Sequence, residues 1–348
     1  MKKNIIFCGT PKFATSSLEQ LFRCQQEFNF NLNAVITIPD KKVGRGNKMT
    51  ESAVKKMAKH LNLPIFEPYD LTNNQFINKV KSLNPDLIIV IAFKKLPKIL
   101  FEIPKIGTIN LHASLLPKYR GAAPINWAII HGEKQTGLTT FFINEQIDTG
   151  DIILQSNIKI PTHYHAGDLH DKLMNESSSL IFKTIDKIFT NNYQIKKQSF
   201  NSKKNIFPIA PKIQKKDRLF KIQDYRDSVG LKKAYNFIRG MSPPGVKMQL
   251  KIHKNDDTYR TSTITITKVG NYIKNEIQDE KLFNMLVISK KDNRLIIQNP
   301  NMNGEFQIKK LKPENGKEIS DLEFINGFLN QDYKKISIID LDRVSSSS

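Results

Sequence analysis

The sequence predicts an α/β protein in which a Rossmann-like, mostly parallel sheet forms the first domain and a small OB-like β-barrel forms the second. Short apolar runs typical of strands alternate with amphipathic helical segments through the first half of the chain. This alternation stops after a polar stretch, and short alternating strands follow. The length of 348 residues suits two cores of ordinary size.

The strands expected in the first half are short and rich in β-branched residues. They are residues 4–8, 34–38, 63–66, 86–91, 107–113 and 138–143, with helices expected at 16–28, 51–61, 74–83, 123–130 and 168–188. The run 86–93 is almost continuously apolar, which is typical of a central strand buried on both faces. The order of the elements therefore predicts an open, largely parallel sheet in a domain spanning residues 1–190.

A linker is expected at residues 191–216, which are rich in lysine and asparagine and are interrupted by Pro208 and Pro211. The second domain, residues 217–344, begins with a helix at 228–239 and ends with one at 322–329. Between them we expect antiparallel strands at 246–253, 261–269, 286–289, 295–298 and 305–311. About five short strands predict a small OB-like barrel, a shape that often binds nucleic acids. The final serines, 345–348, are expected to be disordered.

The charge balance favours a polyanionic partner. The chain has 54 lysines and arginines against 33 acidic residues, a formal net charge of +21. Both halves share the excess, so it does not form a tail. Heavy use of lysine, asparagine and isoleucine also fits a bias in genome composition, and this alternative stays open.

The compartment expected from the sequence is the cytoplasm. Only Cys8 and Cys24 are present, so neither a disulfide framework nor a zinc site is indicated. The first apolar run ends at Gly9, too soon for a signal peptide. The longest apolar stretch, 87–93, is far below the roughly 20 residues that cross a bilayer, so no membrane association is expected.

Residues 107–124 have the strongest signal of a catalytic pocket. In an extended strand alternate side chains share a face, so Asn110 and His112 would point together into one pocket, an amide donor beside a titratable imidazole. An apolar corner, 114–117, then leads into the polar cluster 118–121, which suits a charged, flat partner.

A second segment supplies an acid. The strand expected at 138–143 leads into Asp148-Thr-Gly-Asp151, and α/β enzymes usually place their chemistry at strand ends. Asp148 would orient and polarise His112. Taken alone, the same tetrapeptide is also a good turn.

Of three further segments, one has two interpretations and the other two argue against a cofactor or a metal site. The loop 39–48 places Lys41, Lys42, Arg45 and Lys48 around two glycines and would clamp a phosphate backbone, or it is a solvated connector. The turn 9–14 lacks the G-x-G-x-x-G spacing, which disfavours a dinucleotide cofactor. The histidines at 163, 165 and 170 lack a further well-placed ligand, so no metal site is expected.

Several motifs together resemble the folate-dependent formyltransferases in order and spacing. They are Asn110-x-His112, the segments 114–117 and 119–124, His131-Gly132, Thr136-Gly137 and Asp148–Asp151. With the opening segment 7–11, the Gly44-Arg-Gly46 loop and the second domain, the chain is similar nearly end to end to the branch of this family that acts on methionyl-tRNA. The C-terminal region matches mainly at residues 238–243.

This resemblance implies transfer of a formyl group from the co-substrate 10-formyltetrahydrofolate to the α-amine of methionine on initiator tRNA. It implies Asn110, His112 and Asp148 as the catalytic trio. The folate pocket would be lined by Phe93 and by Ser114, Leu115, Leu116 and Pro117. Arg45 in the basic loop would reach the tRNA acceptor end, and the barrel would present basic side chains to the tRNA body. A monomer is sufficient for this reaction.

The residue types agree with such chemistry. Attack on a formyl carbon builds negative charge on its oxygen and positive charge on the amine, so the site needs an anion-stabilising donor and a proton acceptor. We assign Asn110 and protonated His112 to the oxygen, and Asp148 to holding the imidazole and relaying the amine proton. Two alternatives remain: a small amine acceptor, such as a glycinamide ribonucleotide or an amino sugar, and a non-catalytic RNA-binding protein on the same scaffold.

Overall fold

The structure is a computed structural model that describes residues 2–43, 47–199, 207–225, 229–274, 287–298, 304–329 and 333–340. The chain divides into two compact units. The first consists of Met1–Pro124, Gln135–Lys159 and His170–Pro211, and the second of Ile125–Lys134, Ile160–Leu169 and Lys212–Ser348. The serines 345–348, expected to be disordered, lie outside the described residues.

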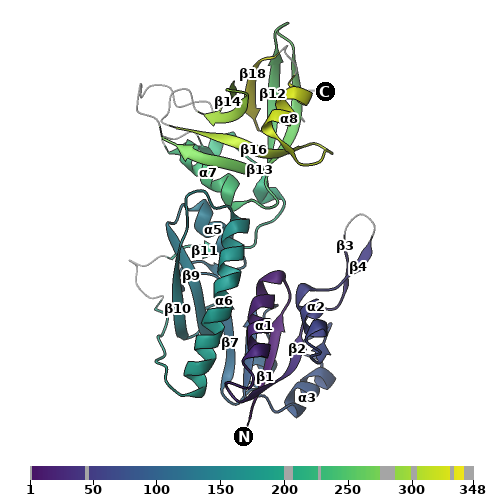
Figure 1. The fold of residues 1–348 in the computed structure, drawn as a ribbon, viewed down its shortest axis with the longest axis vertical. Helices are drawn as coiled ribbons and strands as arrows, with labels where there is room; N and C mark the ends of the chain where they lie inside the picture. The colour runs from purple at the N-terminus through teal and green to yellow at the C-terminus, as the bar shows by residue number, and fades with distance from the viewer. Residues whose placement is uncertain are drawn as a thin grey trace. The chain divides into compact units, whose positions relative to one another are not determined.

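A seven-stranded sheet organises the first unit, in the order β10-β9-β7-β6-β1-β2-β5 (Figure 1). Its strands are β1 (Lys3–Gly9), β2 (Phe30–Ile36), β5 (Ile65–Phe66), β6 (Leu87–Ile91), β7 (Gly107–His112), β9 (Gln135–Phe142) and β10 (Ile152–Lys159). The strands from β7 through β6, β1 and β2 to β5 run parallel, whereas β9 is antiparallel to β7 and β10 to β9. This confirms the predicted mostly parallel α/β sheet.

Helices cover both faces of this sheet. They are α1 (Thr15–Arg23), α2 (Ala53–His60), α3 (Asn74–Ser82), α4 (Lys98–Phe101) and α6 (Ala166–Phe189), and a 3-10 turn (Lys12–Ala14) precedes α1. On one face α1 and α6 lie side by side, joined by a 2.9 Å hydrogen bond between the Ser17 and Ser177 hydroxyls (Figure 1). On the other face α3 and α4 pack Val80 and Leu100 into a core with β1 and β6.

Some boundaries differ from those expected. α1 ends at Arg23 rather than near residue 28, and a turn follows it. At the end of this turn Asn29, with a positive φ of 49°, leads directly into β2, which begins four residues earlier than expected. The edge strand β10 was not expected, since the C-terminal half of its sequence is mostly polar and has no clear apolar face. The hairpin of β3 (Lys41–Val43) and β4 (Lys48–Thr50) was expected only as a loop.

An all-antiparallel sheet organises the second unit. Its strands are β12 (Val246–Lys254), β13 (Tyr259–Ile273), β14 (Val287–Lys291), β15 (Arg294–Gln298), β16 (Glu305–Pro313), β17 (Ile319–Ser320) and β18 (Tyr333–Ile339). The order β13-β12-β18-β14-β15-β16, with an additional β13–β16 pairing, brings the sheet round nearly into a barrel. This agrees with the predicted OB-like class, although β18, which joins β12 to β14, was not expected.

Helices complete the second unit. They are α5 (Pro124–Ile130), α7 (Gly230–Gly240) and α8 (Asp321–Phe328), with 3-10 turns at Lys216–Arg218 and Ile222–Tyr225. α7 buries Leu231, Tyr235 and Ile238 in the barrel core. α8 begins with a capping box in which Ser320 and Glu323 satisfy each other's backbone N–H groups.

Within the described ranges, no helix has the length and apolar character needed to cross a membrane.

Cys8 and Cys24 are buried free thiols, and burial raises the pKa of Cys24 to about 11.

Candidate active site

Strand β7 carries the predicted Asn110 and His112 at the middle of the first unit's sheet. The strand lies between β6 and β9, with Asn110 opposite Val90 on one side and Phe141 on the other. The two side chains are two residues apart in a strand and therefore share a face. Asn110 is half-buried and His112 is 7% exposed, so both are largely shielded from water.

The imidazole of His112 is held between two oxygen acceptors. Its Nε2 donates to the carbonyl oxygen of Tyr119 at 2.8 Å. Its Nδ1 lies 3.7 Å from Oδ2 of Asp148, which is close enough for a charge interaction but long for a hydrogen bond. The structure therefore brings together the imidazole and the acid that the sequence placed in separate segments.

Local backbone geometry fixes Asp148. The residue has a positive φ of 55°, and its Oδ2 accepts a 2.8 Å hydrogen bond from the backbone N–H of Gly121. Gly150 must be glycine, since a β-carbon there would lie 1.7 Å from the Phe142 carbonyl oxygen. Asn144 closes the turn from the other side by accepting from the Thr149 hydroxyl at 2.9 Å.

Gly121 belongs to a short strand, β8 (Arg120–Gly121), which pairs in parallel with β11 (Ile209–Ala210). It has φ +121°, and a β-carbon would lie 2.5 Å from the Ala210 carbonyl oxygen. The backbone N–H of Tyr119 donates to the carbonyl oxygen of Pro208 at 2.6 Å. Residues 208–210, expected within the linker, thus hold the segment that contacts both His112 and Asp148.

Residues with a β-carbon adopt positive φ at three places around this site. They are Ala92 at 49°, Tyr119 at 59° and Asp148 at 55°. Ala92 follows Ile91, which pairs with Leu111, the residue before His112. Such strained backbone is maintained where the surrounding structure fixes it and is concentrated at functional sites.

The apolar corner after β7 is only partly available to a ligand. Ser114 is fully buried and its hydroxyl donates to the Lys118 carbonyl at 2.6 Å, while Leu116 packs against Phe141 and Ile152. The peptide bond between Leu116 and Pro117 is cis. Of the residues expected to line a folate pocket, Leu115, Pro117 and Phe93 retain exposed surface.

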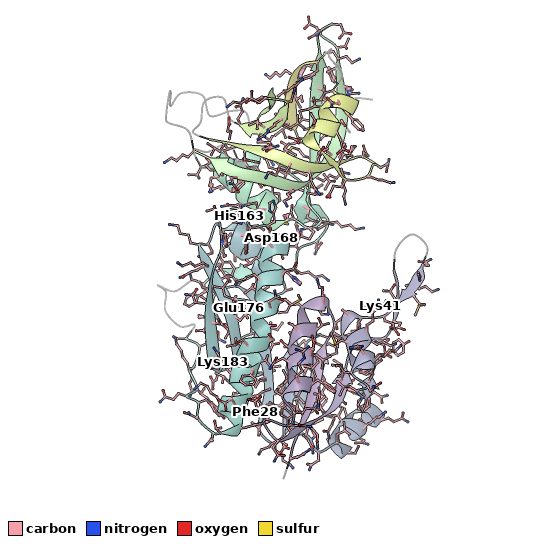
Figure 2. All side chains as sticks on the ribbon, in the orientation of Figure 1. Phe28, Lys41, His163, Asp168, Glu176 and Lys183 are labelled. Carbon is pink, nitrogen blue, oxygen red and sulfur yellow. The ribbon has the colours of Figure 1, made fainter. Side chains whose placement is uncertain are left out.

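The basic loop of the sequence is the β3–β4 hairpin, which stands out from the first unit (Figure 1). Lys41, labelled in Figure 2, and Lys42 lie on β3 and Lys48 on β4, all exposed. Arg45, also predicted to contact the tRNA, lies outside the described residues.

The base of this hairpin is tied by Lys55 of α2. Its ammonium group lies 2.8 Å from Asp40, which precedes β3, and 3.9 Å from Glu51, which follows β4. A third carboxylate, Glu67, lies 2.9 Å away. The hydrogen bonds with Asp40 and Glu67 raise the pKa of Lys55, so it stays charged.

The histidines at 163, 165 and 170, for which no metal site was expected, do not share one environment. In the second unit, His165 is buried and its Nε2 accepts from the Val269 backbone N–H at 3.1 Å. His170, assigned to the first unit, packs its ring against Phe13. Over the described part of the chain, no cluster of three His, Cys, Asp or Glu side chains has the geometry to hold a metal ion.

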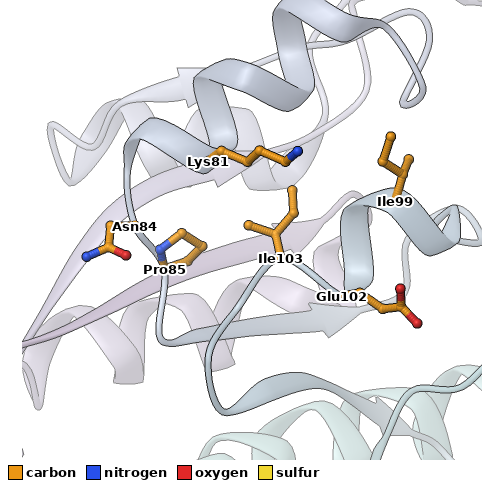
Figure 3. Close-up of a pocket in the computed structure, with 6 residues that line it drawn as sticks. All are labelled: Lys81, Asn84, Pro85, Ile99, Glu102 and Ile103. Atoms are coloured by element: carbon orange, nitrogen blue, oxygen red, sulfur yellow. The ribbon is translucent and has the colours of Figure 1, made fainter.

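A pocket of about 460 Å³ lies elsewhere in the first unit (Figure 3). It is lined by Lys81, Asn84, Pro85, Ile99, Glu102 and Ile103, at the end of α3 and along α4. None of these is a predicted site residue.

Sequence reasoning did not identify three groups of the site. These are the Tyr119 carbonyl, the Gly121 N–H and the side chain of Gln198, whose Nε2 donates to the carbonyls of Gly150 at 2.7 Å and Asp148 at 3.1 Å. The first two are backbone atoms, which no side-chain pattern reveals. Gln198 stands in a polar stretch that gives no periodic signal.

Comparisons with known proteins place the chain in a family. The family model described as formyl transferase matches residues 1–185. Methionyl-tRNA formyltransferase of Flavobacterium johnsoniae is 38% identical over 338 residues, covering 96% of this chain and 99% of the relative. The enzyme of the same name from Clostridium acetobutylicum is 44% identical over 241 residues, covering 69% and 73%.

Solved structures share the fold. A sugar 3N-formyl transferase, determined in the presence of dTDP and 5-N-formyl-THF, superposes with a TM-score of 0.60 at 21% identity, covering 88% of this chain and 98% of its own. An N-formyltransferase from Helicobacter canadensis, in complex with folinic acid and dTDP-3-aminofucose, gives a TM-score of 0.59 at 19% identity, covering 88% and 99%. On the family match and the identity to relatives along nearly its whole length, the chain belongs to the methionyl-tRNA formyltransferases of the formyl transferase family.

Proposed function

We propose that this chain transfers the formyl group of 10-formyltetrahydrofolate to the α-amino group of methionine esterified to initiator tRNA, giving the formylmethionyl-tRNA that starts translation. Family membership supports the reaction class. The observation that carries the proposal is the engagement of His112 by both the Tyr119 carbonyl and the Asp148 carboxylate, with Asn110 on the same face of β7.

The surroundings of His112 suit a protonated ring. Both ring nitrogens face oxygen acceptors, and only the imidazolium has two N–H donors. Nε2 donates at 2.8 Å, whereas the 3.7 Å separation at Nδ1 leaves that N–H without a short hydrogen bond, so it can donate to a formyl oxygen bound beside it. The carboxylate of Asp148 would then stabilise the charged ring.

The reaction divides between these groups as follows. The amine nitrogen attacks the formyl carbon, and Asn110 and His112 donate hydrogen bonds to the oxygen as it gains negative charge. A free α-amine titrates near pH 8, so about a tenth of it is already neutral at pH 7 and positioning matters more than activation. As the new C–N bond forms, Asp148 takes the amine proton and relays it to the tetrahydrofolate nitrogen, which leaves as a neutral amine when the old C–N bond breaks.

The exposed parts of the corner suit the flat folate co-substrate. Leu115, Pro117 and Phe93 offer apolar surface, while buried Ser114 and Leu116 keep the shape of the corner. We propose that these apolar surfaces contact the pterin and that backbone groups contact its edges.

Two basic surfaces suit the tRNA. In the first unit, Lys41, Lys42 and Lys48 present charge on the hairpin, and Arg45, which lies between β3 and β4 in the sequence, would add to it. In the second unit, Lys251 of β12 lies 3.7 Å from the ring of Tyr259, which is 58% exposed. An exposed aromatic ring beside lysine is suited to stacking a base beside its phosphate.

We propose that the protein acts as a monomer in the cytoplasm.

A transfer assay tests this function. Purified protein, 10-formyltetrahydrofolate and methionine-charged initiator tRNA should yield formylmethionyl-tRNA, and uncharged tRNA should yield none. Parallel reactions offer a glycinamide ribonucleotide and an amino sugar. Formylation of either small amine without formylation of the tRNA would overturn the proposal, and so would tRNA binding without any transfer.

A further inference from the structure

The segment after α6 returns to the active-site turn. Lys196 makes a pair of 2.9 Å backbone hydrogen bonds with Ile152 of β10. Two residues further on, Gln198 is half-buried and directs its amide nitrogen at the turn that carries Asp148.

This one nitrogen uses both of its hydrogens on the turn. Nε2 donates to the carbonyl oxygen of Gly150 at 2.7 Å and to that of Asp148 at 3.1 Å. The two carbonyls flank Thr149, so the amide spans the turn immediately after the acid. A carboxylate of the same length has no hydrogen to donate and would repel both carbonyls.

The turn needs this support because its conformation is not intrinsically favoured. Asp148 adopts a positive φ, which costs free energy in a residue that has a β-carbon. Contacts with the surrounding structure must offset this cost. The Gly121 N–H holds the carboxylate itself, while Gln198 holds the main chain on either side of Thr149. The Gln198 Oε1 is buried and has no hydrogen-bond partner within the described residues, so the contribution of this side chain lies in its donor end.

We propose that Gln198 is a positioning residue for formyl transfer: by bonding the carbonyls of Asp148 and Gly150 it keeps the Asp148 carboxylate facing His112. This rests on the proposed function and extends it to a residue in the segment after α6. Gln198 acts through Asp148 and does not touch the substrate.

The first test is Gln198→Met, which keeps length and removes the donor. Gln194→Met is the control, because Gln194 is exposed on the same segment. Misplacing a catalytic group by about 1 Å costs up to roughly 100-fold in rate, so we expect Gln198→Met to lower kcat by roughly 10- to 100-fold. The KM for tRNA should stay within about twofold, since Asp148 acts on the transition state. The control should match the wild type.

A double-mutant cycle separates positioning from general support of the fold. In an Asp148→Asn background, Gln198→Met should lower kcat no further, because the group it positions is already disabled. A wild-type kcat for Gln198→Met, a loss found only in KM, or an equal additional loss in the Asp148→Asn background would each overturn the inference. Thermal unfolding of every variant establishes that the comparison is between folded proteins.

Failure of the proposed function is distinguishable in the same experiment. If the wild type formylates a small amine and not the tRNA, the function falls, and the cycle is measured with that amine. If the wild type formylates the tRNA and the cycle fails, only the role of Gln198 falls.

Discussion

At the scale of single residues, the site depends on side chains that are held by backbone atoms. His112 is oriented by the Tyr119 carbonyl and Asp148 by the Gly121 N–H. Both holding groups come from one short segment after β7. The imidazole and the acid are therefore positioned by the main chain. Replacing either side chain removes a reactive group and leaves the backbone groups that held it in place.

Removing one oxyanion donor should reduce the rate and spare binding. For Asn110→Ala and for His112→Ala we expect kcat to fall by about 100- to 1000-fold, since each removes a donor to the developing negative charge. Asn110 is half-buried and His112 is buried, whereas the hairpin lysines are exposed, so the Kd for tRNA should stay near the wild-type value. Single-turnover rates and filter binding measure the two quantities. A large loss of tRNA affinity with an intact rate would reverse the assigned roles.

A buried histidine makes the second unit sensitive to acid. Desolvation lowers the pKa of His165 to about 4, with Arg239 and Lys268 acting in the same direction and Asp168 opposing them. In the unfolded chain an imidazole titrates near 6.5, so the unfolded state binds the extra proton first as the pH falls. Stability due to this residue is thus fully present above pH 6.5 and is lost down to about pH 4.

We therefore expect the unfolding free energy to fall by about 2 kcal/mol more in the wild type than in His165→Gln between pH 7 and pH 4.5. Trp127, the only tryptophan in the chain, belongs to the second unit and reports its unfolding by fluorescence. The exposed His163 provides the control substitution, His163→Gln (Figure 2). Equal pH dependence in wild type and His165→Gln would contradict this account.

The residue pairs that sequence could predict were those within one strand. Asn110 and His112 share a face because of strand geometry, which needs no tertiary information. Asp148 was placed beside His112 on the motif pattern. The groups that hold these residues are backbone atoms or, in Gln198, a polar side chain distant in sequence, and local patterns contain no signal for them.

At the scale of elements, strong apolar periodicity predicted the strands and helices that build the first core. β6 is apolar throughout and α3 has a clear apolar face, and both were found where expected. Among the strands that were missed, β18 is stabilised by pairing with β12, which is distant in sequence, and a local window does not detect such pairing. β10 is an edge strand that pairs with β9, the strand before it. The β3–β4 hairpin was missed because its residues are nearly all polar.

The hairpin should lose its orientation when its base is untied. Lys55→Met leaves the Asp40, Glu51 and Glu67 carboxylates near one another without their shared cation. We expect faster proteolysis at the hairpin lysines and a roughly tenfold lower kcat/KM for tRNA, with the KM for folate unchanged. Lys59→Met is the control, since Lys59 is exposed and pairs with Glu51 alone among these acids. If the two variants behaved alike, Lys55 would have no special role.

At the scale of the whole molecule, charge is expected to favour the encounter with tRNA. The net charge of +21 is distributed over both halves of the sequence, so both halves are expected to contribute to the attraction to RNA. The proposed catalytic groups, Asn110, His112 and Asp148, lie in the first unit. Affinity for tRNA and chemistry are thus expected to respond to different substitutions.

Salt dependence tests this separation. The logarithm of the tRNA binding constant should fall linearly with the logarithm of salt concentration, because each lysine that binds a phosphate releases counterions condensed on the RNA. Replacing Lys41, Lys42, Lys48 or Arg45 by alanine should reduce that slope by about one each if the residue contacts a phosphate, and should leave folate affinity unchanged. Binding titrations from low to high salt give the slopes. Unaltered slopes in all four variants would exclude the hairpin from the RNA interface.

The most direct measurement is a crystal structure with a non-transferable formyl-folate analogue. The account predicts that the formyl oxygen lies about 3 Å from the Asn110 amide and from the His112 ring, with Asp148 within reach of the position that the amine would occupy. A formyl carbon bound in another part of the first unit, with these three side chains on no common side of it, would contradict the account.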